Sequence, residues 1–115
     1  MPSDRSDIDI LRHMLRYCDQ IADAHQDYGF SKERFAVKTA YQNAVSMCIF
    51  QIGELVNHLS KEFQANHDEI PWHKIRGMRN YIAHAYGTLD MDIVWSAATV
   101  SIKELRTFCE HYLEQ

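Results

Sequence analysis

Apolar residues recur along this chain at spacings of three and four, which is the period of an amphipathic helix. The first such pattern covers residues 7–27 with two neighbouring apolar rows, and it predicts a helix with a wide buried face. Gly29 then suits the left-handed position that often follows a helix. A second pattern begins after Ser31, a good N-cap, and predicts one long helix to about residue 62. Gly53 in its middle costs about 1 kcal/mol relative to Ala and marks a close helix crossing or a slight bend.

Two further helices are predicted in the second half of the chain. Residues 64–70 read as a polar connector, and Pro71 suits the first turn of a third helix that runs to Ala85. After a turn, Asp90 can cap a fourth helix that extends to the C-terminus. No strand pattern or internal repeat is present. We therefore expect a single all-α domain over residues 1–115, an antiparallel four-helix bundle with room for an extra short helix.

Composition narrows the class of protein. The chain is 46% hydrophobic and 24% charged, as expected of a globular domain, and its formal net charge is −4. A general nucleic-acid coat protein needs many lysine and arginine contacts to phosphate, which this charge disfavours. Any nucleic acid or nucleotide must therefore be held locally.

Cysteine usage and hydropathy predict a cytoplasmic protein. The three cysteines are widely spaced, with no pair at metal-ligand or redox spacing, so reduced thiols are expected. No apolar run approaches the roughly 20 residues that span a bilayer, and the N-terminus lacks the layout of a signal peptide. We expect neither export nor insertion into a membrane.

One stretch, residues 77–86, concentrates the chemistry of the chain. It contains an arginine, an amide, an imidazole and two phenols, all groups that can contact a phosphate. The surrounding window, residues 70–89, holds Lys74, Arg76 and Arg79 but no aspartate or glutamate. The local field is predicted to be positive although the whole chain is acidic.

A helical wheel divides this stretch into faces. At about 100° per residue, four apolar positions fall within one sector of roughly 80° that must face the bundle. They are Ile75, Met78, Ile82 and Ala85. Asn80 and His84 lie together on the outward side, with His73 and Gly77, while Arg79 and Tyr86 share a border position.

Arg79 and His84 do not converge on one ideal helix, because five residues separate their directions by about 140°. Either the helix ends near His84 and lets its side chain swing round, or a second copy across a two-fold axis completes the site. Gly77 on the outward face would permit close approach of that copy. We favour a homodimer.

These groups could support RNA cleavage by internal attack of a 2′-hydroxyl on the adjacent phosphate. An imidazole can transfer protons near neutral pH, and an arginine fork can stabilise charge on phosphate oxygens. Asn80 could orient a phosphate oxygen or the imidazole. No metal is required, which agrees with the lack of an HExxH motif, a carboxylate cluster or paired Cys and His ligands.

At these residues the chain resembles the HepT-like toxins of the HEPN superfamily. Arg79, His84 and Tyr86 match the family signature of Arg, four residues, His, one residue, Tyr. The remaining matching segments are Ile70-Pro71-Trp72, Gly77-Met78, the polar Asn80, Val94-Trp95 and Ile52-Gly53-Glu54. The resemblance covers most of the chain.

The resemblance implies a dimeric HEPN-like bundle that acts as a metal-independent endoribonuclease, without a cofactor. Arg79 and His84 of each chain would be catalytic at the interface, and Asn80 would assist. It further implies a toxin–antitoxin system in which a minimal, MntA-like nucleotidyltransferase antitoxin transfers AMP from ATP onto Tyr86. An anionic group there would compete with phosphate for Arg79.

Other interpretations stay open from the sequence. Arg79 could merely pair with a carboxylate such as Glu54, and Tyr86 could be a core or interface residue. Tyr81 is expected to be structural, and Trp72 and Trp95 to be core anchors or dimer contacts. The chain could also be a non-catalytic subunit that binds a nucleotide or substrate for a nucleotidyltransferase, or a plain helical interaction module.

Overall fold

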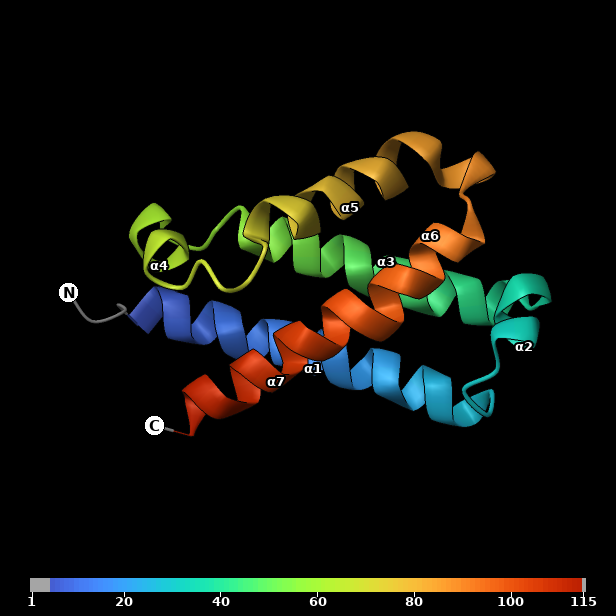
Figure 1. Cartoon of the computed structure of the whole chain (residues 1–115), viewed down its shortest axis with the longest axis horizontal. Helices are drawn as coiled ribbons and strands as arrows, with labels where there is room; N and C mark the ends of the chain where they lie inside the picture. The colour runs from blue at the N-terminus through green and yellow to red at the C-terminus, as the bar shows by residue number, and fades with distance from the viewer. Residues whose placement is uncertain (1–4, 115) are drawn as a thin grey trace.

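The computed structural model describes residues 5–114, and every regular element in that range is helical. Figure 1 shows the main helices running in alternating directions, so that α1 begins and α7 ends at the same end of the molecule. The main helical segments are α1 (Arg5–Asp27), α3 (Thr39–Val56), α5 (Trp72–Ala85) and the final run α6 (Met91–Ser96) to α7 (Ile102–Leu113). The predicted antiparallel four-helix bundle is confirmed. The ends of the predicted domain, residues 1–4 and 115, lie outside the described residues.

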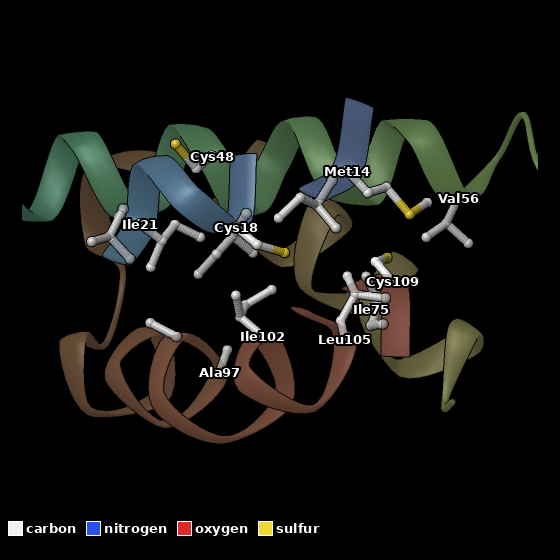
Figure 2. Packing of buried hydrophobic residues seen from close by; sticks show 14 of the residues in the cluster. Met14, Cys18, Ile21, Cys48, Val56, Ile75, Ala97, Ile102, Leu105 and Cys109 are labelled. Atoms are coloured by element: carbon white, nitrogen blue, oxygen red, sulfur yellow. The ribbon is translucent and has the colours of Figure 1, made fainter. Parts of the chain in front are cut away.

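The apolar rows of the helices meet in one core. Figure 2 shows buried side chains from α1, α3, α5 and the C-terminal helix directed toward one another. The labelled members are Met14, Cys18, Ile21, Cys48, Val56, Ile75, Ala97, Ile102, Leu105 and Cys109. All three cysteines are buried here as free thiols. The helices of residues 5–114 lack the combination of length and hydrophobicity that a membrane span requires.

The prediction of one long second helix is wrong, because the chain breaks it at Lys38. α2 (Lys32–Val37) is capped by Ser31 as expected, but Lys38 is extended, with φ −94° and ψ 104°, before α3 begins. Phe35 and Tyr41 explain the break, since their side chains would diverge by about 120° on a straight helix. In the structure both are buried and their rings pack edge to face at 4.9 Å.

The second helical segment also ends earlier than predicted, at Val56, and a separate helix, α4 (Lys61–Asn66), spans the predicted end of that segment and the start of the expected polar connector. Ser60 begins α4, where its hydroxyl accepts a hydrogen bond from the Phe63 N–H at 3.0 Å. The buried Asp7 carboxylate of α1 accepts hydrogen bonds from the Ser60 N–H and hydroxyl, at 2.9 and 2.8 Å. A tertiary contact thus fixes the reversal between α3 and α5.

The predicted fourth helix is not uniform. After Asp90, whose side chain caps it, the run widens into a π-helical segment, η2 (Ala97–Ser101), between α6 and α7. The Thr99 hydroxyl donates to the Trp95 carbonyl at 2.8 Å, an i−4 bond that is known to distort helices. The expected left-handed Gly29 is confirmed, with φ 68°.

Candidate active site

Helix α5 carries the candidate site, and its apolar and polar sides face the bundle and the solvent as the helical wheel predicts. Trp72, Ile75 and Ile82 are buried against the bundle. The outward residues His73, Gly77, Asn80 and His84 are exposed. The predicted division of this helix into a core face and a solvent face is therefore confirmed.

Gly53 is the point at which α5 crosses α3. A Cβ atom added at Gly53 would lie 2.2 Å from Arg79 Cβ and 3.3 Å from Arg79 Cα. Only a residue without a side chain lets the two backbones approach so closely. Of the two interpretations of Gly53 left open by the sequence, a close helix crossing and a slight bend, the structure shows the close crossing, which places Arg79 directly over α3.

Three neighbours hold the Arg79 side chain. Its Nε donates to a carboxylate oxygen of Glu54, and its Nη1 donates to Asn80 Oδ1 at 3.2 Å. The guanidinium carbon also lies 4.9 Å from the centroid of the Phe50 ring, a cation–π contact. Arg79 is thus oriented by an acid, an amide and an aromatic face.

The ion pair with Glu54 is the carboxylate contact that the sequence left open for Arg79. It does not use all the N–H groups of the guanidinium. The Arg79 side chain is 29% exposed, and within residues 5–114 no hydrogen bond occupies its Nη2. An arginine fixed at Nε can still offer its terminal N–H groups to an anion. The arrangement can both fix the side chain and leave it able to bind a phosphate oxygen.

His84 is the third predicted catalytic residue on α5. It is exposed near the end of α5, and across the described part of the structure it makes no hydrogen bond or ion pair. The helix ends at Ala85, one residue after His84, so the alternative of a helix that ends near His84 stays open beside that of a second copy. Of the predicted catalytic residues, Arg79 and Asn80 are joined by a hydrogen bond, and His84 follows Asn80 by four residues on the same exposed face of α5.

Tyr86 begins a short 3₁₀ turn, η1 (Tyr86–Thr88), directly after α5. It is 58% exposed, and its hydroxyl donates to Asn43 Oδ1 on α3 at 3.4 Å. The interpretation as a core residue is therefore wrong. Tyr86 also lines a cavity of about 200 Å³ with Met47, Phe50, Ile82 and Ala83.

The other aromatic residues of this region behave as structural groups. The Tyr81 hydroxyl accepts the Asp90 N–H at 2.7 Å and so ties α5 to the start of α6. Trp72 is buried, and Trp95 lies in a cluster of rings around Tyr41. Of the two expected roles, core anchor or dimer contact, the structure shows both tryptophans packed in or against the core, with Trp95 partly buried.

Sequence reasoning missed Phe50 and Asn43. Phe50 lies four residues before Glu54 on α3, so one face of that helix presents both to Arg79. That spacing was a usable signal once α3 and α5 were known to cross at Gly53. No three His, Cys, Asp or Glu side chains in the described residues converge where they could hold a metal ion.

Comparison with known proteins decides the family. A family model described as "Ribonuclease HepT-like" matches residues 14–112, which include every candidate site residue. The chain belongs to the HepT-like family of the HEPN superfamily. This confirms the resemblance seen in the motif.

Several relatives of this HepT-like chain carry names that refer to RNA cleavage. "Putative RNase TTE0752" of Caldanaerobacter subterraneus subsp. tengcongensis is 30% identical over 91% of this chain and 92% of the relative. "Putative RNase MJ0125" of Methanocaldococcus jannaschii is 31% identical over 84% and 81%. "Probable ribonuclease HepT" of Thermococcus cleftensis is 28% identical over 89% and 91%. No solved structure matches the chain significantly.

Proposed function

We propose that this HepT-like chain is the toxin of a toxin–antitoxin system and a metal-independent endoribonuclease. The observation that carries the proposal is the fixed Arg79, whose Nε is held by Glu54 while no hydrogen bond within residues 5–114 occupies its Nη2, on a side chain that is 29% exposed. The same helix presents His84 to solvent. The names of the relatives support the choice of RNA as substrate.

The proposed reaction is a transesterification within the RNA strand. The 2′-hydroxyl oxygen forms a bond to phosphorus while the bond from phosphorus to the 5′-oxygen breaks. One His84 takes the proton of the 2′-hydroxyl, and the partner subunit's His84 gives a proton to the departing 5′-oxygen. Arg79 stabilises the charge on the phosphate oxygens, and the products carry a 2′,3′-cyclic phosphate and a 5′-hydroxyl.

The active form is proposed to be a homodimer. The divergence of about 140° between Arg79 and His84 on an ideal helix supports this, because a two-fold axis would bring each imidazole toward the arginine of the other copy. The open space beside Gly77, where an added Cβ meets nothing within 4 Å, would admit such a partner. Sedimentation equilibrium should give twice the mass of one chain.

Tyr86 is the proposed site of control by a nucleotidyltransferase antitoxin. Its exposed hydroxyl is accessible for transfer of AMP, and the helix that it directly follows carries Arg79. A transferred adenylyl group is anionic and would compete with the RNA phosphate for that arginine. Co-expression with such an enzyme should add mass in AMP units, and Tyr86→Phe should remove the addition. No added mass would contradict this part of the proposal.

The Glu54 contact also favours a second candidate, a non-catalytic subunit that binds a nucleotide or substrate. A carboxylate beside Arg79 lowers the net positive charge of the site and would weaken stabilisation of a more anionic transition state. In that case a nucleotide would bind at Arg79 while RNA stayed intact.

Cleavage of RNA in the presence of EDTA separates the two candidates. The ribonuclease proposal predicts cleavage by the unaltered protein and a loss of about 10²- to 10⁴-fold in rate with His84→Ala. His73→Ala is the matched control, since His73 is another exposed histidine on the same helix. Equal losses in both variants, or undiminished cleavage by His84→Ala, would overturn the assignment.

A further inference from the structure

An apolar groove lies beside the candidate phosphate site. Its walls come from α3, from the end of α5 and from Tyr86 at the start of η1, and its volume is about 200 Å³. Two of its lining side chains are unusually open for apolar groups, Met47 at 52% and Tyr86 at 58% exposed. Single exposed apolar residues need no explanation, but here they line one concave surface.

The groove and the anion site share a wall. The Phe50 ring lines the groove and also lies under the Arg79 guanidinium, 4.9 Å from its carbon atom. A ligand in contact with Phe50 would therefore have a cation beside it. An apolar occupant with an attached anionic group fits this juxtaposition better than a purely apolar one.

The volume limits the occupant to something small. Pockets for drug-sized ligands usually enclose about 300–1,000 Å³, more than this groove offers. One flat ring system fits, while a sugar and phosphate would remain outside, on the side of Arg79. Aromatic and methionine side chains are the surfaces on which such rings stack.

We propose that this groove binds one nucleobase of single-stranded RNA, adjacent to the phosphate at Arg79. The inference deepens the proposed ribonuclease function and rests on it for the identity of the phosphate. Tyr86 lines the groove, and its hydroxyl, which donates to Asn43 Oδ1, can offer a polar atom to the base edge. Stacking accepts any base, so the groove gives affinity and position rather than a strict sequence preference.

Binding of adenosine 5′-monophosphate and of ribose 5-phosphate to the unaltered protein tests the inference, measured by calorimetry in EDTA. The two ligands share the phosphate and the sugar and differ in the base. Stacking should make the nucleotide bind about five- to a hundredfold more tightly. Equal affinity for the two ligands would overturn the inference.

Variants locate the effect. Phe50→Leu should make the affinities for adenosine 5′-monophosphate and ribose 5-phosphate nearly equal. Phe50→Tyr should keep most of the preference for the nucleotide. Met47→Ala, at a more exposed position, should reduce the difference without risk to the core, while Val100→Ala, an exposed apolar residue outside this groove, should not change it. If Phe50→Leu folds and keeps the full difference, the base binds elsewhere and the inference is wrong.

The competing occupant of the groove is a second copy of this chain. If Met47→Asp converts a stable dimer to monomers and the unaltered dimer shows no preference for the nucleotide, the groove is a contact between copies and the inference fails. Failure of the proposed function looks different. If the protein cleaves RNA but shows no preference for the nucleotide, only the inference of a base-binding groove is wrong. If it prefers the nucleotide but does not cleave RNA, only the proposed ribonuclease function is wrong.

Discussion

The crossing at Gly53 gives the most quantitative prediction about the site. Gly53→Ala would place a carbon 2.2 Å from Arg79 Cβ and 3.0 Å from its Cγ, whereas carbon atoms pack best at about 3.5–4.0 Å. A change of rotamer cannot move Arg79 Cβ or its Cα, which would be 3.3 Å away. Helix α5 must therefore shift by more than about 1 Å.

Overpacking of this kind costs about 1–3 kcal/mol. Replacing a helical glycine by alanine returns about 1 kcal/mol, so Gly53→Ala alone should lower the free energy of unfolding by about 0–2 kcal/mol. That range is too small to identify the clash, and a double-mutant cycle with Arg79→Gly removes the ambiguity. Arg79→Gly deletes Cβ, the atom that the added methyl group would strike. The cost of a glycine at position 79 is measured in the single variant and is subtracted in the cycle.

Urea unfolding of the four proteins in the cycle provides the assay. We expect the double variant to be about 1–3 kcal/mol more stable than the sum of the single effects predicts. A control cycle of Gly87→Ala with Arg79→Gly should be additive, since a Cβ at Gly87 meets nothing within 4 Å. Additivity within about 0.5 kcal/mol in the Gly53 cycle would refute the close crossing and the orientation of Arg79 that depends on it.

Other predictions concern the outward face of α5, the buried His25 and the thiols. Gly77→Ala should leave the fold of one chain intact, because an added Cβ meets nothing, but should raise the dissociation constant of a dimer that packs there; an unchanged dimer would place the interface elsewhere. Burial lowers the pKa of His25, partly offset by the Ala98 carbonyl, so the unfolded chain binds that proton more tightly. The free energy of unfolding should therefore decrease as pH falls below about 6.5, with a smaller slope in His25→Gln, and equal slopes by urea unfolding would contradict this. Burial also raises the thiol pKa values, to about 12 for Cys109, so a disulfide reagent should react with the thiols only after unfolding; rapid labelling of the native protein would show that they are accessible. The thiols are Cys18, Cys48 and Cys109.

The faces of α5 could be predicted because a short helix with a few large apolar residues has only one way to bury them. The positions of Ile75 and Ile82 alone determine that Asn80 and His84 point to solvent. The same periodicity could not predict the break at Lys38. Neither glycine nor proline marks that position, and the cause is tertiary, since Phe35 and Tyr41 must both reach one aromatic cluster.

The candidate site was predictable in its chemistry and less so in its contacts. The composition of residues 77–86 indicated an anion site, and the wheel indicated that Arg79 and His84 diverge. Whether Arg79 pairs with Glu54 depends on the register of α3 against α5, which periodicity within each helix does not determine. Phe50 was missed for the same reason, because its role appears only once the two helices cross at Gly53.

The chemical identity of the RNA ends tests the central claim most directly. The substrate is a DNA oligonucleotide that contains a single ribonucleotide and therefore a single 2′-hydroxyl. Incubated with the protein in EDTA, it should yield one fragment with a 2′,3′-cyclic phosphate and one with a 5′-hydroxyl. Arg79→Ala and His84→Ala should prevent the formation of both product ends, and His73→Ala should still form them. A 3′-hydroxyl with a 5′-phosphate, cleavage that needs a divalent metal, or full activity of His84→Ala would contradict catalysis by Arg79 and His84.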